Sequence, residues 1–395
     1  MTPTPDPPVR TAPPALLIVT RNFPPAIGGI ERVVAEAAWA LTLDFRVVVI
    51  GPVGGERGRD SGIEYWPVAP SPVIRFFRRT RQLAVRIARE IRPCAVLAGS
   101  GVMAPAARAA ARASGCPAWA LVHGLDVTAR HPLYRIFFTP SIKRLDGVLA
   151  NSRATAGAAC RLGVPEARIS QIALGVDRPG WPPPRDCRER IRRKWGIPGE
   201  ARLLLFVGRL TVRKGIGPFI EEVLAPLVAS DPGIHLAVVG AAPVQALGRV
   251  GVRPEDLVHR AERAGFGAHL HLVGPLTGVR LDEAYFSSDL FVFPVLERPG
   301  DMEGFGLVAL EAAAHGLATV AFATGGIPDA VSDPESGDLV PPGDYAAMGQ
   351  AIRRRLAEDP VEAGHAAWRF AGERSWARFS YELKAWVLAH RPSAS

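Results

Sequence analysis

The sequence predicts an α/β protein built from two doubly wound domains. Short continuous apolar runs alternate with helical stretches along the chain, which is the pattern of parallel strands covered by helices on both faces. Such a unit begins twice, at residues 15–19 and at residues 203–207, and a proline-rich segment separates the two units. With 395 residues, of which 48% are hydrophobic, the chain is long enough for two domains of this kind.

Composition narrows the class of protein further. No apolar run approaches the roughly 20 residues that a helix needs to cross a bilayer. Residues 1–14 are rich in proline and lack an apolar core, so we expect a disordered lead and not a signal peptide. The four cysteines are far apart and lack the spacing of metal ligands, which favours free thiols in a reducing cytoplasm.

Charge is distributed unevenly between the two halves. The net charge is +9, yet residues 1–178 carry 23 Lys and Arg against 12 Asp and Glu, whereas residues 179–395 carry 24 against 26. We therefore expect the N-terminal half to face an anionic partner, which could be a phosphate group, a membrane or a nucleic acid.

The N-terminal domain is predicted at residues 15–178. Its strands are expected at residues 15–19, 45–50, 95–98, 119–122 and 147–150, with helices such as residues 31–41 and 104–113 between them. Gly28 and Gly29 form a turn between the first strand and the helix that begins at Glu31. A glycine turn before a helix brings backbone N–H groups to a phosphate, although a lone glycine pair is also typical of an ordinary turn.

Polar residues follow two of these strands. His123, Gly124 and Asp126 come after residues 119–122, and Asn151 with Ser152 comes after residues 147–150. Ligands of open α/β sheets bind at the carboxyl ends of the strands, so these are candidate site residues. A histidine in such a place is also often a structural hydrogen-bond partner.

A linker at residues 179–186 leads to the C-terminal domain, predicted at residues 187–375. Its further strands are expected at residues 235–240, 270–273, 290–295 and 317–322. Arg209 and Lys214 follow the opening strand, between Gly208 and Gly215. Arginine offers a planar fork to a phosphate and lysine a point charge, but two such cations are also compatible with an ordinary surface turn.

The stretch Glu303-Gly304-Phe305-Gly306-Leu307-Val308-Ala309-Leu310-Glu311 holds the strongest functional signal. Gly304 and Gly306 allow bare backbone to approach a ligand at the start of a helix. Glu311 lies about 12 Å further along the chain if the segment is helical, within an otherwise apolar helix, so its carboxylate should have a partner or a ligand. Two carboxylates at this separation suit an elongated ligand such as a nucleotide sugar.

Taken with these residues, the chain resembles the retaining glycosyltransferases of family four, which have the GT-B fold. The resemblance covers roughly residues 15–390. Four motifs carry it: Gly28-Gly29, His123-Gly124, Arg209 with Lys214, and the E-x7-E spacing of Glu303 and Glu311. It implies two Rossmann-like domains that face each other across a cleft, with a C-terminal helix at residues 376–395 that crosses back to the N-terminal domain.

The resemblance also implies roles for the candidate residues. Arg209 and Lys214 would bind the donor diphosphate, Glu303 the sugar hydroxyls and Glu311 the ribose, while His123 would contact the donor sugar. The other donor-side candidates are Gly28, Gly29, Gly304, Phe305, Gly306, Leu307 and Gly274, and the acceptor-side candidates are Asp126, Asn151 and Ser152. Ala173-Leu174 departs from the family pattern, so no function is assigned there.

The predicted reaction is the retaining transfer of a hexosyl unit from a UDP- or GDP-sugar to a glycan, a lipid-linked acceptor or a small molecule. The sequence contains no Asp-x-Asp motif, so we expect no metal and no further cofactor. Two alternatives stay open. One is a phosphorylase or a nucleotide-sugar epimerase of the same architecture, and the other is a non-catalytic protein that binds membranes or RNA.

A basic stretch from Arg75 to Arg92 contains seven arginines and one acidic residue, interspersed with Leu83 and Ile87 among other apolar positions. It is either an ordinary helix docked by one face or an interfacial helix on an anionic membrane. Residues 130–144 form a second basic and aromatic segment. No nucleic-acid partner is expected, because no known binding module is present. We expect a cytoplasmic protein that is peripheral on the inner face of the membrane.

Overall fold

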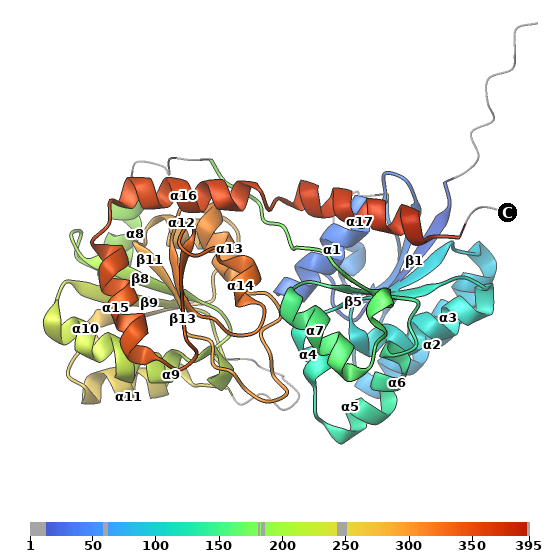
Figure 1. Cartoon of the computed structure of the whole chain (residues 1–395), viewed down its shortest axis with the longest axis horizontal. Helices are drawn as coiled ribbons and strands as arrows, with labels where there is room; N and C mark the ends of the chain where they lie inside the picture. The colour runs from blue at the N-terminus through green and yellow to red at the C-terminus, as the bar shows by residue number, and fades with distance from the viewer. Residues whose placement is uncertain (1–12, 58–61, 181, 183–185, 243–250, 393–395) are drawn as a thin grey trace, which may run out of the picture.

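The computed structural model describes residues 13–57, 62–180, 182, 186–242 and 251–392. The chain forms two parallel sheets, each flanked by helices (Figure 1). The strand orders are β3-β2-β1-β4-β5-β6-β7 and β10-β9-β8-β11-β12-β13. Each order reverses beside the first strand of its domain, which is the doubly wound arrangement. The predicted fold class is confirmed.

The first sheet consists of β1 (Ala15–Val19), β2 (Arg46–Pro52), β3 (Glu64–Val68), β4 (Ala95–Ala98), β5 (Ala118–Val122), β6 (Gly147–Ala150) and β7 (Ile169–Gln171). The second consists of β8 (Arg202–Val207), β9 (Ile234–Val239), β10 (Leu270–Gly274), β11 (Leu290–Phe293), β12 (Thr319–Phe322) and β13 (Gly337–Val340). The sequence analysis does not predict β3, β7 and β13. All three lie at the edges of their sheets, where a strand needs no long apolar run.

The helices of the N-terminal domain are α1 (Gly29–Leu41), α2 (Val73–Ile91), α3 (Ala104–Ser114), α4 (Gly124–Thr128), α5 (Pro132–Phe137), α6 (Thr139–Ile142) and α7 (Arg153–Leu162). The C-terminal domain contains α8 (Cys187–Trp195), α9 (Ile216–Phe219), α10 (Ala225–Ser230), α11 (Pro254–Arg263), α12 (Val279–Phe286), α13 (Leu307–Ala314), α14 (Ile327–Ala330), α15 (Tyr345–Leu356) and α16 (Pro360–Gly372). The last helix is α17 (Trp376–His390). Among the described residues, no helix combines the length and apolarity required to cross a membrane.

Both faces of each sheet carry a hydrophobic core. In β1, Leu16 and Ile18 pack with α1 on one face, while Leu17 and Val19 pack with α2 and α3 on the other. A strand covered in this way must be apolar at every position, because neither face meets water. This is why the continuous runs were sufficient to locate the central strands.

The basic helix α2 is docked by its apolar side. Phe76, Ala84 and Ile87 are buried in the core of the N-terminal domain, and Leu83 packs against it. The apolar residues of α2 therefore fit the first interpretation, that of an ordinary helix docked by one face. Its arginines lie on the opposite, exposed side.

Helix α17 returns to the N-terminal domain, as predicted. In Figure 1, α16 runs along the C-terminal domain and α17 continues across the N-terminal one. Leu383 and Val387 are buried in the same core as α1. The ring of Trp386 lies 4.9 Å from that of Trp119, between centroids, and its indole N–H donates to Ser170 at 2.8 Å.

Two chain segments connect the domains, and they lie side by side. Val176 pairs with Ser375 in an isolated parallel bridge, and a Cβ on Gly175 would collide with the backbone of Ser375 and Trp376. The segments therefore meet at backbone distance. The predicted domain boundaries stay predictions: the lead at residues 1–14 falls almost wholly outside the described residues, as do residues 181 and 183–185 of the linker.

Candidate active site

The two domains meet at the carboxyl ends of their strands. Gly124 follows β5, and a Cβ placed on it would lie 2.7 Å from the carbonyl oxygen of Met302. A Cβ on Gly304, in the loop after β11, would lie 2.8 Å from the amide nitrogen of Gly124. Because both close approaches are to backbone atoms, neither position has room for a side chain. The loop that carries Glu303 is thus held against the N-terminal domain.

Hydrogen bonds fix this loop from both sides. The hydroxyl of Thr155, in α7, donates to the Gly304 carbonyl oxygen at 3.3 Å. From the C-terminal domain, the Gly326 N–H donates to the carbonyl oxygen of Glu303 at 2.9 Å. A glycine at position 304 is therefore required by the packing of the domains. Its predicted contact with the donor stays a prediction.

Glu303 lies at the centre of a buried charge cluster. Its carboxylate accepts hydrogen bonds from Lys214 Nζ at 2.8 Å and from the Arg213 guanidinium. Arg213 also pairs with Asp301, at 3.2 Å between Nε and Oδ1. Burial opposes ionisation of Glu303, but the charges of Lys214 and Arg213 outweigh burial and hold its pKa well below the usual range. Burial also disfavours the charged form of Lys214, and it lowers the pKa of this lysine to about 8 against the opposing effect of Glu303.

Arg209 and Arg213 have different environments. Arg209 is exposed and its side chain forms no hydrogen bond or ion pair with the described residues, although its charge contributes to lowering the pKa of Lys214. It is close to the cluster and available to a ligand. Of the two arginines, Arg213 is the one that contacts Glu303, and the sequence analysis does not identify it as a site residue. The only sequence signal is its position directly before Lys214, in the turn Val212–Lys214.

Glu311 has a protein partner. Tyr285 in α12 is buried, and its hydroxyl donates to Glu311 Oε2 at 3.1 Å. The Tyr285 ring stacks on His315, 4.8 Å between centroids, and His315 Nε2 lies 3.0 Å from Asp282 Oδ1. Burial raises the pKa of Glu311, against the hydrogen bond from Tyr285. The expectation that a carboxylate in this apolar helix has a partner is confirmed, while its contact with a ribose stays a prediction.

The first loop of the N-terminal domain lies near the start of α13. Gly28 precedes α1 in an extended conformation, and a Cβ on Gly29 would lie 3.9 Å from Leu307 Cδ2. The predicted glycine turn and the predicted start of α13 therefore face each other. Gly306 has a φ of +93°, a left-handed conformation that favours glycine, and it begins α13.

His123, Asp126 and Ser152 have structural partners. His123 Nε2 lies 3.2 Å from the Gly99 carbonyl oxygen, and its backbone N–H donates to Asp126 Oδ2 at 2.9 Å, at the start of α4. Ser152 Oγ accepts from the Thr155 N–H at 3.0 Å and caps α7. These contacts explain the residues locally, and their catalytic or acceptor-side roles stay predictions.

The structure gives three further candidates, Asn151, Phe305 and Gly274, different surroundings. The buried Asn151 Oδ1 has no hydrogen-bond partner in the described part of the chain, and its Nδ2 lies 3.2 Å from where a Cβ of Gly304 would be. Phe305 is buried in the core shared with the N-terminal domain. Gly274 ends the edge strand β10 with a φ of +82°, and a Cβ there would meet nothing within 4 Å. Its contact with a nucleobase stays a prediction.

No three His, Cys, Asp or Glu residues within the described ranges are arranged to hold a metal ion. Lys214, Arg209 and Arg213 together place three positive charges beside two carboxylates, those of Glu303 and Asp301, which leaves the cluster suited to an anionic ligand.

Comparisons with known proteins agree with this geometry. The model of Glycosyltransferase Family 4 matches residues 27–178, and that of Glycosyl transferases group 1 matches residues 187–367. The chain is similar to the D-inositol 3-phosphate glycosyltransferase of Mycolicibacterium smegmatis, with 30% identity over 53% of this chain and 45% of that protein. The match thus spans about half the length of that relative.

A second relative is matched almost from end to end. The GDP-mannose-dependent alpha-(1-6)-phosphatidylinositol monomannoside mannosyltransferase of the same organism is 29% identical over 93% of this chain and 95% of its own length. Among solved structures, HepE of Anabaena in complex with UDP has a TM-score of 0.75 at 17% identity, covering 95% of this chain and 100% of HepE. The two family models, the paired sheets and the Glu303–Glu311 motif lead to one conclusion: the chain belongs to the family 4 glycosyltransferases of the GT-B fold.

Proposed function

We propose that this protein transfers a hexosyl unit from a nucleoside-diphosphate sugar to an acceptor, with retention of anomeric configuration and without a metal ion. The observation that carries the proposal is the cluster of Lys214, Arg213 and Glu303, with the exposed Arg209 beside it, at the carboxyl ends of the strands. Cations fixed before the reaction stabilise charge that develops on a leaving group, and they need no reorganisation when it appears.

In the proposed step, one bond of the donor sugar breaks and one forms. The bond from the anomeric carbon to the diphosphate oxygen breaks, and the acceptor oxygen forms its bond on the same face of the sugar. The acceptor's proton passes to an oxygen of the leaving diphosphate. Arg209 and Lys214 stabilise the negative charge on that leaving group, while Glu303 accepts hydrogen bonds from the sugar hydroxyls and Glu311 from the ribose.

The similarity to a mannosyltransferase named for a phosphatidylinositol mannoside favours a lipid-linked acceptor. We therefore propose that the protein works in the cytoplasm at the inner face of an anionic membrane. GDP-mannose is the first donor to test, because the match to that relative covers nearly the whole chain. UDP-glucose is the second, because a structural neighbour binds UDP.

A thermal-shift screen tests the donor first. A ligand that binds only the folded protein raises the melting temperature by mass action, so the correct nucleotide should do so while the others do not. Turnover of that donor is then measured with and without inorganic phosphate. Transfer to an acceptor without phosphate is the expected result. Sugar phosphate formed only when phosphate is present would instead identify a phosphorylase, and no shift with any nucleotide would contradict the proposal.

A further inference from the structure

His315 lies directly after α13, one helical turn beyond Glu311. It is only 6% exposed, and its ring packs against α12. The Tyr285 ring stacks on it at 4.8 Å between centroids, and the Phe286 ring meets it edge-on at the same distance. The sequence analysis assigns no role to this histidine, and the proposed reaction step does not use it.

Both ring nitrogens of His315 face atoms that can only accept a hydrogen bond. Nδ1 lies 2.7 Å from the carbonyl oxygen of Glu311, and Nε2 lies 3.0 Å from Asp282 Oδ1. The side chain of Asp282 is 47% exposed, and an ionised carboxylate has no proton to donate. Both nitrogens must therefore carry a proton, which makes the imidazole a cation. The C-terminal end of a helix favours a cation at this position.

The ionisation of Glu311 depends on this charge. Burial raises the pKa of Glu311, and the hydrogen bond from Tyr285 opposes this effect. The charges of His315 and, from α1, of Arg32 oppose it as well. Since a hydroxyl both donates and accepts, Tyr285 would fit a protonated carboxyl as well as an ionised one. A nearby cation distinguishes the two states, because it stabilises only the ionised one.

We propose that His315 is a positioning residue for the nucleotide, which keeps the Glu311 carboxylate ionised and directed at the ribose hydroxyls. Oε2 is fixed by Tyr285, and within the described residues Oε1 accepts no hydrogen bond. An ionised carboxylate oxygen can accept from neighbouring hydroxyl groups, whereas a protonated carboxyl offers fewer acceptor sites. The inference rests on the proposed function, because it assumes that Glu311 binds the ribose of a nucleoside diphosphate.

The charge of His315 is measured by NMR of the free protein labelled with nitrogen-15. We expect both ring nitrogens to be protonated at neutral pH. Asp282→Asn removes the carboxylate charge and keeps the shape, so His315 should lose its proton at a lower pH than in the wild type. Asp256→Asn is the matched control, since this similarly exposed aspartate of α11 pairs with Arg253. A His315 ring that is neutral at neutral pH would overturn the inference.

His315→Gln tests the effect on the ribose. The probes are GDP and UDP with their 2′-deoxy counterparts, and binding is measured by calorimetry. Loss of the charge should weaken binding of the ribonucleotide by about tenfold and of its deoxy counterpart by about threefold or less, so the preference for ribose falls. A purely structural role would weaken both probes equally. In the Glu311→Ala background, His315→Gln should add no further loss, because the residue through which it acts is absent.

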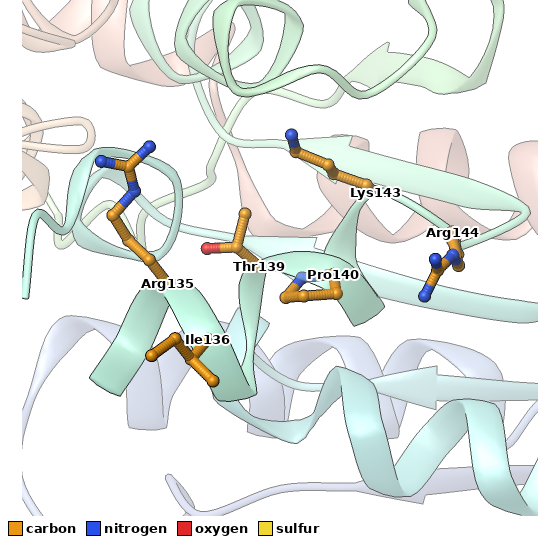
Figure 2. Close-up of a pocket in the computed structure, with 6 residues that line it drawn as sticks. All are labelled: Arg135, Ile136, Thr139, Pro140, Lys143 and Arg144. Carbon is orange, nitrogen blue, oxygen red and sulfur yellow. The ribbon is translucent and has the colours of Figure 1, made fainter. Parts of the chain in front are cut away.

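A second basic region requires a control, because nucleotides are anions. A pocket of about 450 Å³ in the N-terminal domain is lined by Arg135, Ile136, Thr139, Pro140, Lys143 and Arg144 (Figure 2). Lys143→Gln should leave the affinity and the ribose preference unchanged. A wild type that binds neither nucleotide would contradict the proposed function, and with it the role of His315 toward ribose, whatever the NMR result. If nucleotide binds, an unchanged ribose preference in His315→Gln, or an equal loss in the Glu311→Ala background, would overturn the inference alone.

Discussion

At the residue scale, the proposed function depends on a few charged side chains whose partners come from distant parts of the sequence. Glu303 is separated from Arg213 and Lys214 by about ninety residues, yet all three meet in one buried cluster. Removing one member leaves the others buried with an unbalanced charge, which is costly. Substitutions in this cluster therefore need a neighbour outside it for comparison, and the exposed Arg209 provides one.

Arg209→Ala should lower kcat on the order of 10²-fold, because one donor to the developing charge is lost. The melting temperature should change little, since Arg209 is exposed and its side chain forms no hydrogen bond or ion pair with the residues that the structure describes. Lys214→Met should lower kcat at least as much and also destabilise the protein, because it leaves Glu303 without one of its two partners. Steady-state kinetics and thermal melts measure both effects. Wild-type turnover in both variants would exclude these cations from leaving-group stabilisation.

The two glutamates should be separable by their ligands. Glu311→Ala should weaken binding of the nucleoside diphosphate alone by roughly 10–100-fold, as the loss of a charged hydrogen bond does. Glu303→Gln should instead impair the intact donor sugar and leave the free nucleotide nearly unaffected. Tyr285→Phe, which removes only the hydrogen bond to Glu311, should give a smaller loss in the same direction as Glu311→Ala. Calorimetry with each ligand decides. Equal losses of free nucleotide in the two glutamate variants would contradict the assigned roles.

At the scale of elements, strands β9 and β10 are joined by more than their backbone ladder. His235 in β9 lies with its Nδ1 3.0 Å from His271 Nε2, and its ring centroid lies 4.6 Å from that of His269. Burial lowers the pKa of His235 to about 4, and the nearby charges of His269, His271 and Arg192 act in the same direction. The His235 imidazole is therefore uncharged at neutral pH.

The free energy of unfolding should consequently fall as the pH drops. The pKa of His235 is lower in the folded protein than the usual value of 6.5, so the unfolded chain binds the proton first. The stabilisation is complete above pH 6.5 and is lost as the pH falls from there towards 4. Urea unfolding across this range measures it, and His235→Asn should flatten the dependence. A profile unchanged by the substitution would show that other groups control it.

At the scale of the whole molecule, the two domains contact each other directly beside the candidate site. Asp329 in α14 accepts hydrogen bonds from Arg153 Nε at 3.0 Å and from Gln171 Nε2 at 3.1 Å, both in the N-terminal domain. The backbone contact of Gly124 with Gly304 and Met302 lies in the same interface. The polar bonds link the domains, and the glycine contact sets how closely they approach.

Gly124→Ala should therefore impair closure without unfolding either domain. The added methyl would meet backbone atoms of Met302 and Gly304 in the other domain. These atoms can move aside only if the two domains separate. We expect kcat/KM to fall by about tenfold or more, as misplacement of reacting groups by about 1 Å does elsewhere. Gly199→Ala is the control, because a Cβ at Gly199 meets nothing within 4 Å. Steady-state kinetics and small-angle scattering measure these effects. An unchanged kcat/KM would show that this contact does not limit closure.

The central strands, the helix starts and the charged motifs could be predicted from sequence because each depends on neighbouring residues. A strand covered on both faces is apolar throughout, as β1 is and as β8 is from Leu203 to Val207, and a glycine before a helix indicates a turn. Edge strands such as β3 and β7 carry no such pattern, because their partners and solvent exposure are set by the sheet.

Pairings across the fold were decided only by the tertiary structure. Arg213 looks like any basic residue in its own turn, and Tyr285 looks like an ordinary core aromatic, until packing brings Glu303 to one and Glu311 to the other. The sequence shows the arginines of α2, but only the structure shows that the apolar face of that helix is buried while Leu133 and Phe137 of α5 are exposed. Local patterns record which surfaces avoid water, whereas the partner of a charge or a hydroxyl depends on distances that only the folded chain defines.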